Sequence, residues 1–441
     1  MKAGGRPSRG VFQPDRRVRW LAARSLPCLV ALLALTCLGL TCLAGGASAQ
    51  SFVGRRGISI HNAMNWGVTG PDKLAYVERP FESEPHRLSP PEIEAVKRAG
   101  FDFVRLTLDP GPFLQFEGKA RDGLDETLTA RIRELLSAGL NVIVDFHPNT
   151  QVAAYAPDKL LRTASPEMFG RFVATVGRTA GLLRPFDPAR VAIEPMNEPN
   201  TGYTPQTERD WQLMMTELYR AARSAAPEHT VVVTGGQGSD IKGLVKMEPA
   251  AFGANTLFTF HFYEPFLFTH QSVASPIPQA FGWRYVSALP YPATGMDAEA
   301  LWAAASARAN ADTKASAAQK LAGLAKLRND LQDYGTAGTV RSVAAAMDRV
   351  AAWAGAHRIA TTRILLGEFG VTRTYSRYRG ALDSDRKNWL GDIRTEAERR
   401  GFRWAYWNLK GYGGMAMQRQ DGQPELDDTI VQALGLPGRR Q

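Results

Sequence analysis

Short apolar runs alternate with segments of helical periodicity along the chain after residue 50. The runs are five to eight residues long and rich in Val, Ile, Leu and Phe, which is typical of strands buried on both faces of a parallel sheet. Between them, apolar residues recur every three to four positions, and Pro, Gly or Thr often marks the ends of these stretches. The strands that this pattern predicts are 57–61, 101–108, 141–146, 191–196, 230–234, 257–262, 363–367 and 402–408.

The helices predicted between these strands are 91–98, 124–138, 166–183, 207–226, 340–357, 385–400 and 427–434. Strands that alternate with helices form a parallel sheet, and eight of them close into a (β/α)₈, or TIM, barrel. A doubly wound sheet predicts fewer strands and a glycine-rich loop after the first one, whereas here that strand continues into His61 and Asn62. We therefore expect an α/β fold, a single (β/α)₈ domain at 50–441.

One interval breaks the regular spacing. About 100 residues separate the sixth and seventh strands, whereas one βα unit of a barrel needs roughly 30. This insertion, at about 264–340, begins rich in Pro and aromatic residues and continues rich in Ala, Lys and Arg, which predicts one or two helices. Because it follows a strand directly, it belongs to the face of the barrel at the C-terminal ends of the strands. There it forms either a cleft wall or lid, or a helical segment exposed to solvent.

The N-terminus has the three parts of an export signal: basic residues up to Arg24, an apolar run at 26–44, and Ala47-Ser-Ala49 as a cleavage site. We expect residues 1–49 to be removed and the protein to be periplasmic or extracellular. The apolar run is long enough that an uncleaved membrane anchor is the alternative. With cleavage we expect no stable membrane partner, and we expect a monomer.

Composition narrows the function further. Hydrophobic residues make up 44% of the chain, which predicts a packed core. The net charge is +10, but residues 1–49 carry a surplus of six positive charges, so the body is only mildly basic and nucleic-acid binding is not expected. All three cysteines, Cys28, Cys37 and Cys42, lie in the signal, which excludes a disulfide framework, a thiolate metal site and a cysteine nucleophile in the mature chain.

Polar and aromatic residues stand at successive strand ends, where a barrel of this type collects its functional groups. Each has a structural alternative: Arg105 with Asp102 or Asp109 as its partner, His147 as a histidine satisfied by Asp145, and the aromatic residues as core. Together they define one cleft. The candidates are Arg105, His147, Asn197, Glu198, His261, Tyr263, Glu368 and Trp407.

Two glutamates give this cleft a chemistry. Glu198 follows the fourth strand, and Glu368, set between Gly367 and Gly370, follows the seventh. Carboxylates that face each other across a glycosidic bond hydrolyse it, one protonating the leaving oxygen while the other attacks or stabilises the anomeric carbon. Arg105 is expected to keep Glu368 ionised, whereas a less compensated environment keeps Glu198 protonated.

Aromatic side chains are expected to stack on the sugar rings bound in this cleft, because pyranose faces are apolar. The candidates are Trp66, Tyr203, Phe266, Trp283, Trp407 and Tyr412.

Six motifs in this order resemble glycoside hydrolase family 5, the cellulase-like branch of the retaining (β/α)₈ glycosidases, over roughly residues 55–435. They are Phe-Val-Arg105-Leu, Val-Asp145-Phe-His147, Asn197-Glu198-Pro199, His261-Phe-Tyr263, Gly367-Glu368-Phe-Gly370 and Trp404-Ala-Tyr-Trp407. The sequence departs from the family pattern at Pro148, where many members have a second polar residue, and in the length of the insertion.

The resemblance implies a role for each candidate. Glu198 would be the acid/base, Glu368 the nucleophile, and Asn197 a ligand of the sugar 2-hydroxyl. Arg105 and Tyr263 would hydrogen-bond the nucleophile. In the same way, the resemblance implies that His147 and His261 line the −1 subsite and that Trp407 is its stacking platform.

The expected function is therefore a secreted retaining glycosidase acting on a β-linked polysaccharide, a β-1,4-glucan first, with β-mannan or β-1,3-glucan left open. A non-catalytic sugar-binding barrel is the alternative, but it has no need of both glutamates. The run Gly235–Ser239 lacks the spacing of a phosphate loop, and the histidines lack the paired helical spacing of zinc ligands. We expect no metal and no cofactor.

Overall fold

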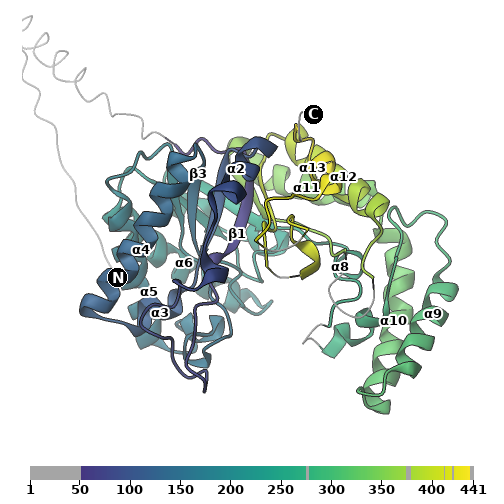
Figure 1. The fold of residues 1–441 in the computed structure, drawn as a ribbon. Coiled ribbons are helices and arrows are strands. Elements are labelled where there is room, and N and C mark those ends of the chain that lie inside the picture. The colour runs from purple at the N-terminus through teal and green to yellow at the C-terminus, as the bar shows by residue number, and fades with distance from the viewer. Residues whose placement is uncertain (1–50, 275–277, 374–378, 412, 420–421, 438–441) are drawn as a thin grey trace, which may run out of the picture. The chain divides into compact units, whose positions relative to one another are not determined.

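The computed structural model describes residues 51–437, apart from 275–277, 374–378, 412 and 420–421. The expected signal and Tyr412 therefore lie outside the described residues. Eight strands form a closed parallel barrel in sequence order (Figure 1), which confirms the predicted fold. The strands are β1 (Arg56–Met64), β2 (Phe103–Leu108), β3 (Asn141–Phe146), β4 (Val191–Glu194), β5 (Thr230–Thr234), β6 (Thr256–His261), β7 (Ile364–Glu368) and β8 (Arg403–Tyr406).

Helices with clear sequence signals surround the barrel. In α2, the Ser89 hydroxyl accepts from the Glu92 amide and the Glu92 carboxylate accepts from the Ser89 amide, a capping box, and Gly100 ends the helix with φ 99°. The longer helices of the barrel are α2 (Pro90–Ala99), α4 (Gly118–Ser137), α5 (Pro166–Leu183), α6 (Pro205–Ala225), α11 (Val340–Ala356) and α12 (Asp383–Arg399). Shorter ones are α3 (Pro110–Gln115), α7 (Ile241–Leu244) and α13 (Asp428–Ala433).

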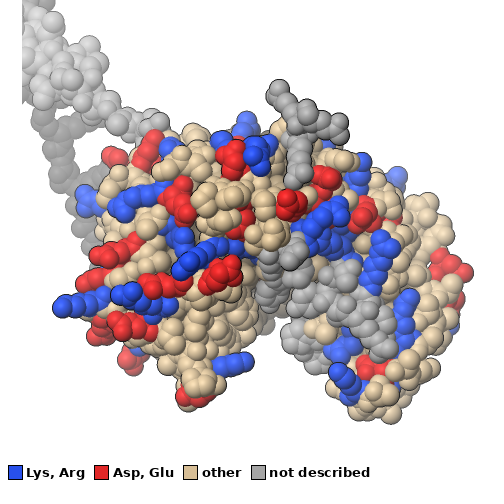
Figure 2. Space-filling model, in the orientation of Figure 1, with Lys and Arg blue, Asp and Glu red and all other residues tan. Residues whose placement is uncertain are grey.

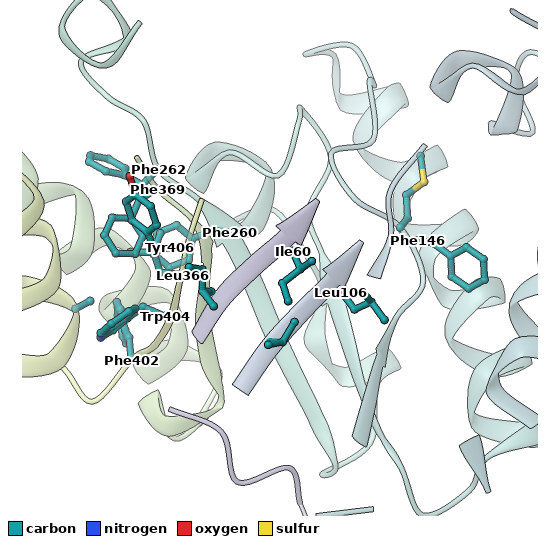
Figure 3. Close-up of a cluster of buried hydrophobic side chains, with 14 of the residues drawn as sticks. Ile60, Leu106, Phe146, Phe260, Phe262, Leu366, Phe369, Phe402, Trp404 and Tyr406 are labelled. Atoms are coloured by element: carbon teal, nitrogen blue, oxygen red, sulfur yellow. The ribbon is translucent and has the colours of Figure 1, made fainter. Parts of the chain in front are cut away.

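The outward faces of the strands pack against these helices. Figure 3 shows part of this layer, in which Ile60, Leu106 and Leu366 project from β1, β2 and β7 near buried aromatic rings. All three are at most 1% exposed. Burial of such side chains contributes about 1.5–3 kcal/mol each, so this layer holds the barrel and its helices together.

The inside of the barrel changes from apolar to polar along the strands. An apolar cluster contains Phe103, Ile143 and Ala192, one each from β2, β3 and β4. Because side chains on one face of a strand are two residues apart, the next inward residues on these strands are Arg105, Asp145 and Glu194. All three are fully buried, so a charged layer lies above the apolar one, toward the C-terminal ends of the strands.

The segment between β6 and β7 carries helices of its own. They are α8 (Phe266–Thr269), the 3₁₀ helix η5 (Pro278–Tyr285), α9 (Ala298–Ala311) and α10 (Ala317–Ala337). The helices α9 and α10 pack on each other and on η5, and Figure 1 shows them as a pair beside the barrel, with α8 between. The chain then returns to the barrel through α11.

Basic and acidic side chains alternate over the face of the molecule seen in Figure 2. This distribution agrees with a body whose charges are nearly balanced. Among the described residues, the structure has no helix with the length and apolarity needed to cross a bilayer.

Candidate active site

Arg105 is the centre of the charged layer. Its Nε and Nη2 donate to the two carboxylate oxygens of Glu194, at 2.8 and 2.9 Å. Nη1 donates to Glu368 Oε1 at 2.6 Å and Nη2 to Asn197 Oδ1 at 2.7 Å, and Nη2 also lies 3.1 Å from Asp145 Oδ2. A fully buried guanidinium with this many fixed acceptors is a rigid positioning element.

The structural partners considered for Arg105 are engaged elsewhere. Asp102 accepts from the backbone amides of Arg55 and Arg56, and Asp109 accepts from Asn149 Nδ2. Arg105 therefore hydrogen-bonds residues of the cleft, Glu368 and Asn197, instead of Asp102 or Asp109.

Glu368 ends β7 and is held by two donors. Besides Arg105, the hydroxyl of Tyr263 donates to Glu368 Oε2 at 2.9 Å, and burial with neighbouring carboxyls raises the pKa of Tyr263, which keeps it a donor. The Glu368 side chain is only 4% exposed. Because both donors favour the charged form, the ionised state is better stabilised at Glu368 than at Glu198.

Glu198 is held differently. Its backbone is in the left-handed region, with φ 36°, a conformation that costs energy for a residue with a side chain and that often marks a functional position. Among the residues that the structure describes, its carboxylate has one hydrogen-bond partner, His261 Nδ1, at 2.8 Å. Of the Glu198 side chain, 43% is exposed to the cleft.

The glycine-rich run after β5 supports Glu198. The Glu198 amide donates to Ser239 Oγ at 3.2 Å, and the His261 amide donates to the Ser239 carbonyl at 2.8 Å. A Cβ at Gly235 would lie 2.1 Å from the Gly243 carbonyl carbon, so only glycine allows this loop to pack so closely. The run is thus a structural support of the site.

The two glutamates titrate as a pair. Desolvation by the surrounding protein raises the pKa of each to about 7, even though part of the Glu198 side chain faces the cleft. Arg105 acts in the opposite direction on both glutamates, and His261 does so on Glu368. Arg105 lowers the pKa of Glu368 less than burial raises it, and its guanidinium also contacts Glu194 and Asp145. That Arg105 keeps Glu368 ionised stays a prediction. Near neutral pH such a pair holds about one proton, and the donors on Glu368 place that proton on Glu198.

The remaining candidates adjoin this pair. Asn197 Nδ2 lies 3.3 Å from His147 Nε2, His147 Nδ1 lies 2.9 Å from Asp145 Oδ2, and the His147 ring stacks on Trp407 with centroids 5.2 Å apart. Burial lowers the pKa of His147 and takes that of His261 to about 4, so both rings are neutral at pH 7. The structure therefore brings all eight candidates into one site.

The site opens into a cleft of about 420 Å³. Glu198, Glu368, Tyr263 and Trp407 line it together with Trp66 and Phe266, two of the aromatic residues expected there, and with residues that the sequence did not suggest. These are His61, Pro148, Asn149, Thr150, Pro157, His270, Val273, Thr372 and Met415.

Two other expected aromatic residues do not line the cleft. Trp283 donates from Nε1 to Asp330 on α10, so it packs within the helical segment. Tyr203 is 70% exposed on the loop after β4. Tyr412 is outside the described residues.

Glu194 is the main residue that sequence reasoning missed. It reads as the end of an apolar strand, and its partner Arg105 is 89 residues away. The only signal was its inward position, two residues after Ala192. His61 was also passed over as a strand end, although its Nε2 lies 2.6 Å from Trp66 Nε1 and its ring contacts Trp407.

Among the described residues, only Glu198, His261 and Glu368 form a group that could hold a metal ion, with ligand atoms all within 4.8 Å of one another. These atoms are already used: His261 binds Glu198, and Arg105 and Tyr263 bind Glu368. The arrangement is that of a proton-sharing carboxyl pair.

Known proteins with this fold carry little overall sequence identity to the chain. A cellulose synthase subunit Z from Clostridioides difficile is 20% identical, with a TM-score of 0.59 over 87% of this chain and 99% of that one. Cel5A of Thermotoga maritima in complex with cellobiose is 20% identical, with a TM-score of 0.59 over 86% and 97%. A family 5 xyloglucanase from Paenibacillus pabuli is 14% identical, with a TM-score of 0.61 over 88% and 98%.

Sequence comparison agrees with this fold. The curated relative Endoglucanase 3 of Fibrobacter succinogenes is 22% identical over 246 residues, which are 55% of this chain but 32% of the relative, so the match spans about a third of the relative's length. The model of the cellulases, glycosyl hydrolase family 5, matches residues 89–413, well over half of the chain. The chain therefore belongs to glycosyl hydrolase family 5, the cellulase family.

Proposed function

We propose that this protein is a retaining β-glycosidase that cleaves β-1,4-glucan as an endoglucanase. The observation that carries the mechanism is the short distance between the carboxyls: one oxygen of Glu198 and one of Glu368 lie within 4.8 Å of each other. Retaining glycosidases separate their carboxyls by about 5–5.5 Å, whereas inverting ones need about 6.5–9.5 Å to admit a water molecule.

In the first step, Glu368 attacks the anomeric carbon and Glu198 gives its proton to the leaving oxygen. The glycosidic bond breaks as a bond to the Glu368 carboxylate forms. In the second step, Glu198 takes a proton from water, which attacks the same carbon and releases Glu368. Arg105 and Tyr263 hold Glu368 ionised for the attack.

The sugar contacts of this proposal come from the family resemblance and from position. Asn197 would bind the 2-hydroxyl beside Glu368, and its amide is fixed by Arg105 on one side and by His147 on the other. Trp407 would support the −1 sugar, and its ring is braced by His147. Groups that are fixed before the substrate arrives favour the transition state, because no binding energy is spent on ordering them.

The preference for glucan rests on the relative from Fibrobacter succinogenes, which is an endoglucanase. Cel5A of Thermotoga maritima has been solved with cellobiose and with mannotriose, so we keep mannan as the competitor that experiment must separate. Chromatography of the products from cello-, manno- and laminari-oligosaccharides separates these substrates. Cleavage confined to mannan or laminarin oligomers would overturn the choice of β-1,4-glucan.

The stereochemistry tests the mechanism. We expect NMR of the first hydrolysed product to show the β-anomer, which then mutarotates. A first product with the α-configuration would require an inverting mechanism and would contradict the proposal.

We also propose that residues 1–49 are an export signal and that the mature enzyme acts outside the cytoplasm as a monomer. N-terminal sequencing of the protein recovered from the periplasm or medium should begin near residue 50. Retention of the first 49 residues in a membrane fraction would instead show an anchor.

A further inference from the structure

The loops after β1 and β3 form one wall of the cleft. Trp66 follows β1, and Pro148, Asn149 and Thr150 follow β3, and all four line the cleft. Asp109 is the first residue after β2, the strand that pairs with both β1 and β3. It is 1% exposed and lies behind the lining residues of this wall. The proposed mechanism gives this buried carboxylate no role.

Asn149 connects Asp109 to both loops of the wall. Its Nδ2 donates to Asp109 Oδ2 at 2.9 Å and to Asn65 Oδ1 at 2.8 Å. Its Oδ1 accepts from the Gln151 amide at 2.9 Å, and Gln151 Nε2 donates to the Gly67 carbonyl at 2.7 Å. The carboxylate is therefore joined to the loops after β1 and β3 through one buried side-chain amide.

Asn65 connects Asn149 to Trp66 and His147. Its Oδ1 accepts from the Trp66 amide and its Nδ2 donates to the His147 carbonyl, both at 2.8 Å. Trp66 has a φ of 55°, a left-handed conformation that is rare for a bulky residue, and the bond from its amide to Asn65 stabilises it. The Trp66 ring then donates from Nε1 to His61 Nε2 at 2.6 Å. The place of this ring in the cleft therefore depends on Asn65.

Asp109 is held as a charged acceptor. Its Oδ1 accepts from the Gly111 amide at 2.9 Å, which caps α3, and the Tyr76 hydroxyl is a further donor to the carboxylate. Burial raises the pKa of Asp109 to about 6, and its donors oppose that rise, so the carboxylate is ionised at neutral pH. Hydrogen bonds to a charged acceptor are the stronger ones, so Asn149 is firmly held.

We propose that Asp109 is a positioning residue, which fixes the wall formed by the loops after β1 and β3 through its bond to Asn149. Trp66 is the side chain of this wall whose place the network sets. The inference rests on the proposed function and adds to it a residue that touches no substrate.

The network acts on substrate binding, because the two glutamates are held by other groups. Arg105 and Tyr263 hold Glu368, and His261 holds Glu198. A wall that contacts the bound substrate and the transition state alike changes KM and leaves kcat nearly unchanged.

Asp109→Asn is the test that changes the structure least. Asparagine has one acceptor oxygen where the carboxylate has two, so it cannot accept from both Gly111 and Asn149. We expect KM for cello-oligosaccharides to rise about tenfold through the loss of a bond to a charged acceptor, with kcat within about twofold. Asp297→Asn is the matched control, because Asp297 caps α9 by accepting from the Ala300 amide at 2.9 Å, and it should change neither constant.

Asn65→Ala removes the connection between Asn149 and Trp66, and it serves if Asp109→Asn does not fold. It should raise KM at least as much as Asp109→Asn. Because the two residues act through one network, the rise in the double variant should be smaller than the product of the two single rises. Rises that multiply would contradict a shared network.

Tryptophan emission tests the network without turnover. Asp109→Asn should shift the emission spectrum of the unsubstituted protein but not that of Trp66→Phe. An unchanged KM in both Asp109→Asn and Asn65→Ala, or a shift that persists in Trp66→Phe, would overturn the positioning role while the proposed function stands. Failure of the unsubstituted enzyme to cleave any oligosaccharide would instead overturn the proposed function, and the emission spectra would still test the network.

Discussion

Glu198 and Glu368 are two glutamates at different strand ends of one cleft, and they differ in the residues that surround them. Glu368 is almost fully buried and accepts from Arg105 and Tyr263. Glu198 is exposed to the cleft, has a backbone φ of 36°, and its carboxylate is hydrogen-bonded to His261. Because the pKa of each is raised to about 7, the roles are set by the hydrogen-bond donors.

The largest expected effect comes from removing the better-held carboxylate. Glu368→Ala should reduce hydrolysis of an aryl β-glycoside by on the order of 10⁴-fold, since no covalent intermediate forms. Initial rates measured by aryl release check this loss. Glu126→Ala, an exposed glutamate on α4, is the control and should keep full activity. Retained activity in Glu368→Ala would mean that the two strand ends are not specialised as described.

Removing the other carboxyl should separate the two roles. Glu198→Ala should lower kcat/KM by about 10²–10⁴-fold for substrates with a poor leaving group, because these need the proton. For a dinitrophenyl glycoside, which needs no proton on its leaving group, the rate of the first step should fall much less. Added azide should then attack the glycosyl-enzyme intermediate in place of water. Equal losses with good and poor leaving groups would contradict the assignment of Glu198 as the acid.

A smaller change tests what holds Glu368. Tyr263→Phe deletes one donor to a charged acceptor, worth about 1.5–3 kcal/mol, so kcat/KM should fall about ten- to a hundredfold. Tyr291→Phe is the matched control, because it deletes a tyrosine–carboxylate bond to Asp392 of α12, and Tyr291 is not part of the cleft lining. A loss in Tyr291→Phe as large as in Tyr263→Phe would point to general destabilisation.

The mildest effect is that of pH. As pH rises, kcat/KM should first increase as Glu368 ionises and then decrease as Glu198 loses its proton, which gives a bell centred near pH 7. Glu198→Gln, assayed with a good leaving group, should lose the alkaline limb alone. An optimum near the ordinary pKa of glutamate, about 4.3, would contradict the effect of burial on this pair.

Much of the fold could be predicted from the sequence, because strands buried on both faces leave unmixed apolar runs. The bounds of β3, β5 and α5 match the predicted ones. The helix α4 begins at Gly118 instead of 124, since its first turns are polar and show no apolar periodicity. The helix α3 was missed because two of its six residues are proline.

The site could be predicted only as far as position along a strand reveals it. Residues at strand ends were found, because the fold itself gathers them. Glu194 was not predicted, and neither were the contacts of Arg105 with Glu194 and Asp145. Both depend on which side chains meet inside a closed barrel. The raised pKa of Glu368 follows first from its burial, which no local pattern of residues shows.

The central claim, that Glu368 attacks and Glu198 protonates, is tested most directly by trapping the intermediate. A 2-deoxy-2-fluoro-β-cellobioside with an activated leaving group should inactivate the enzyme with time, because the fluorine slows hydrolysis of the glycosyl-enzyme more than its formation. Peptide mapping by mass spectrometry should then find the fluorosugar on Glu368. A fluorosugar on Glu198, or turnover without any covalent adduct, would contradict the account.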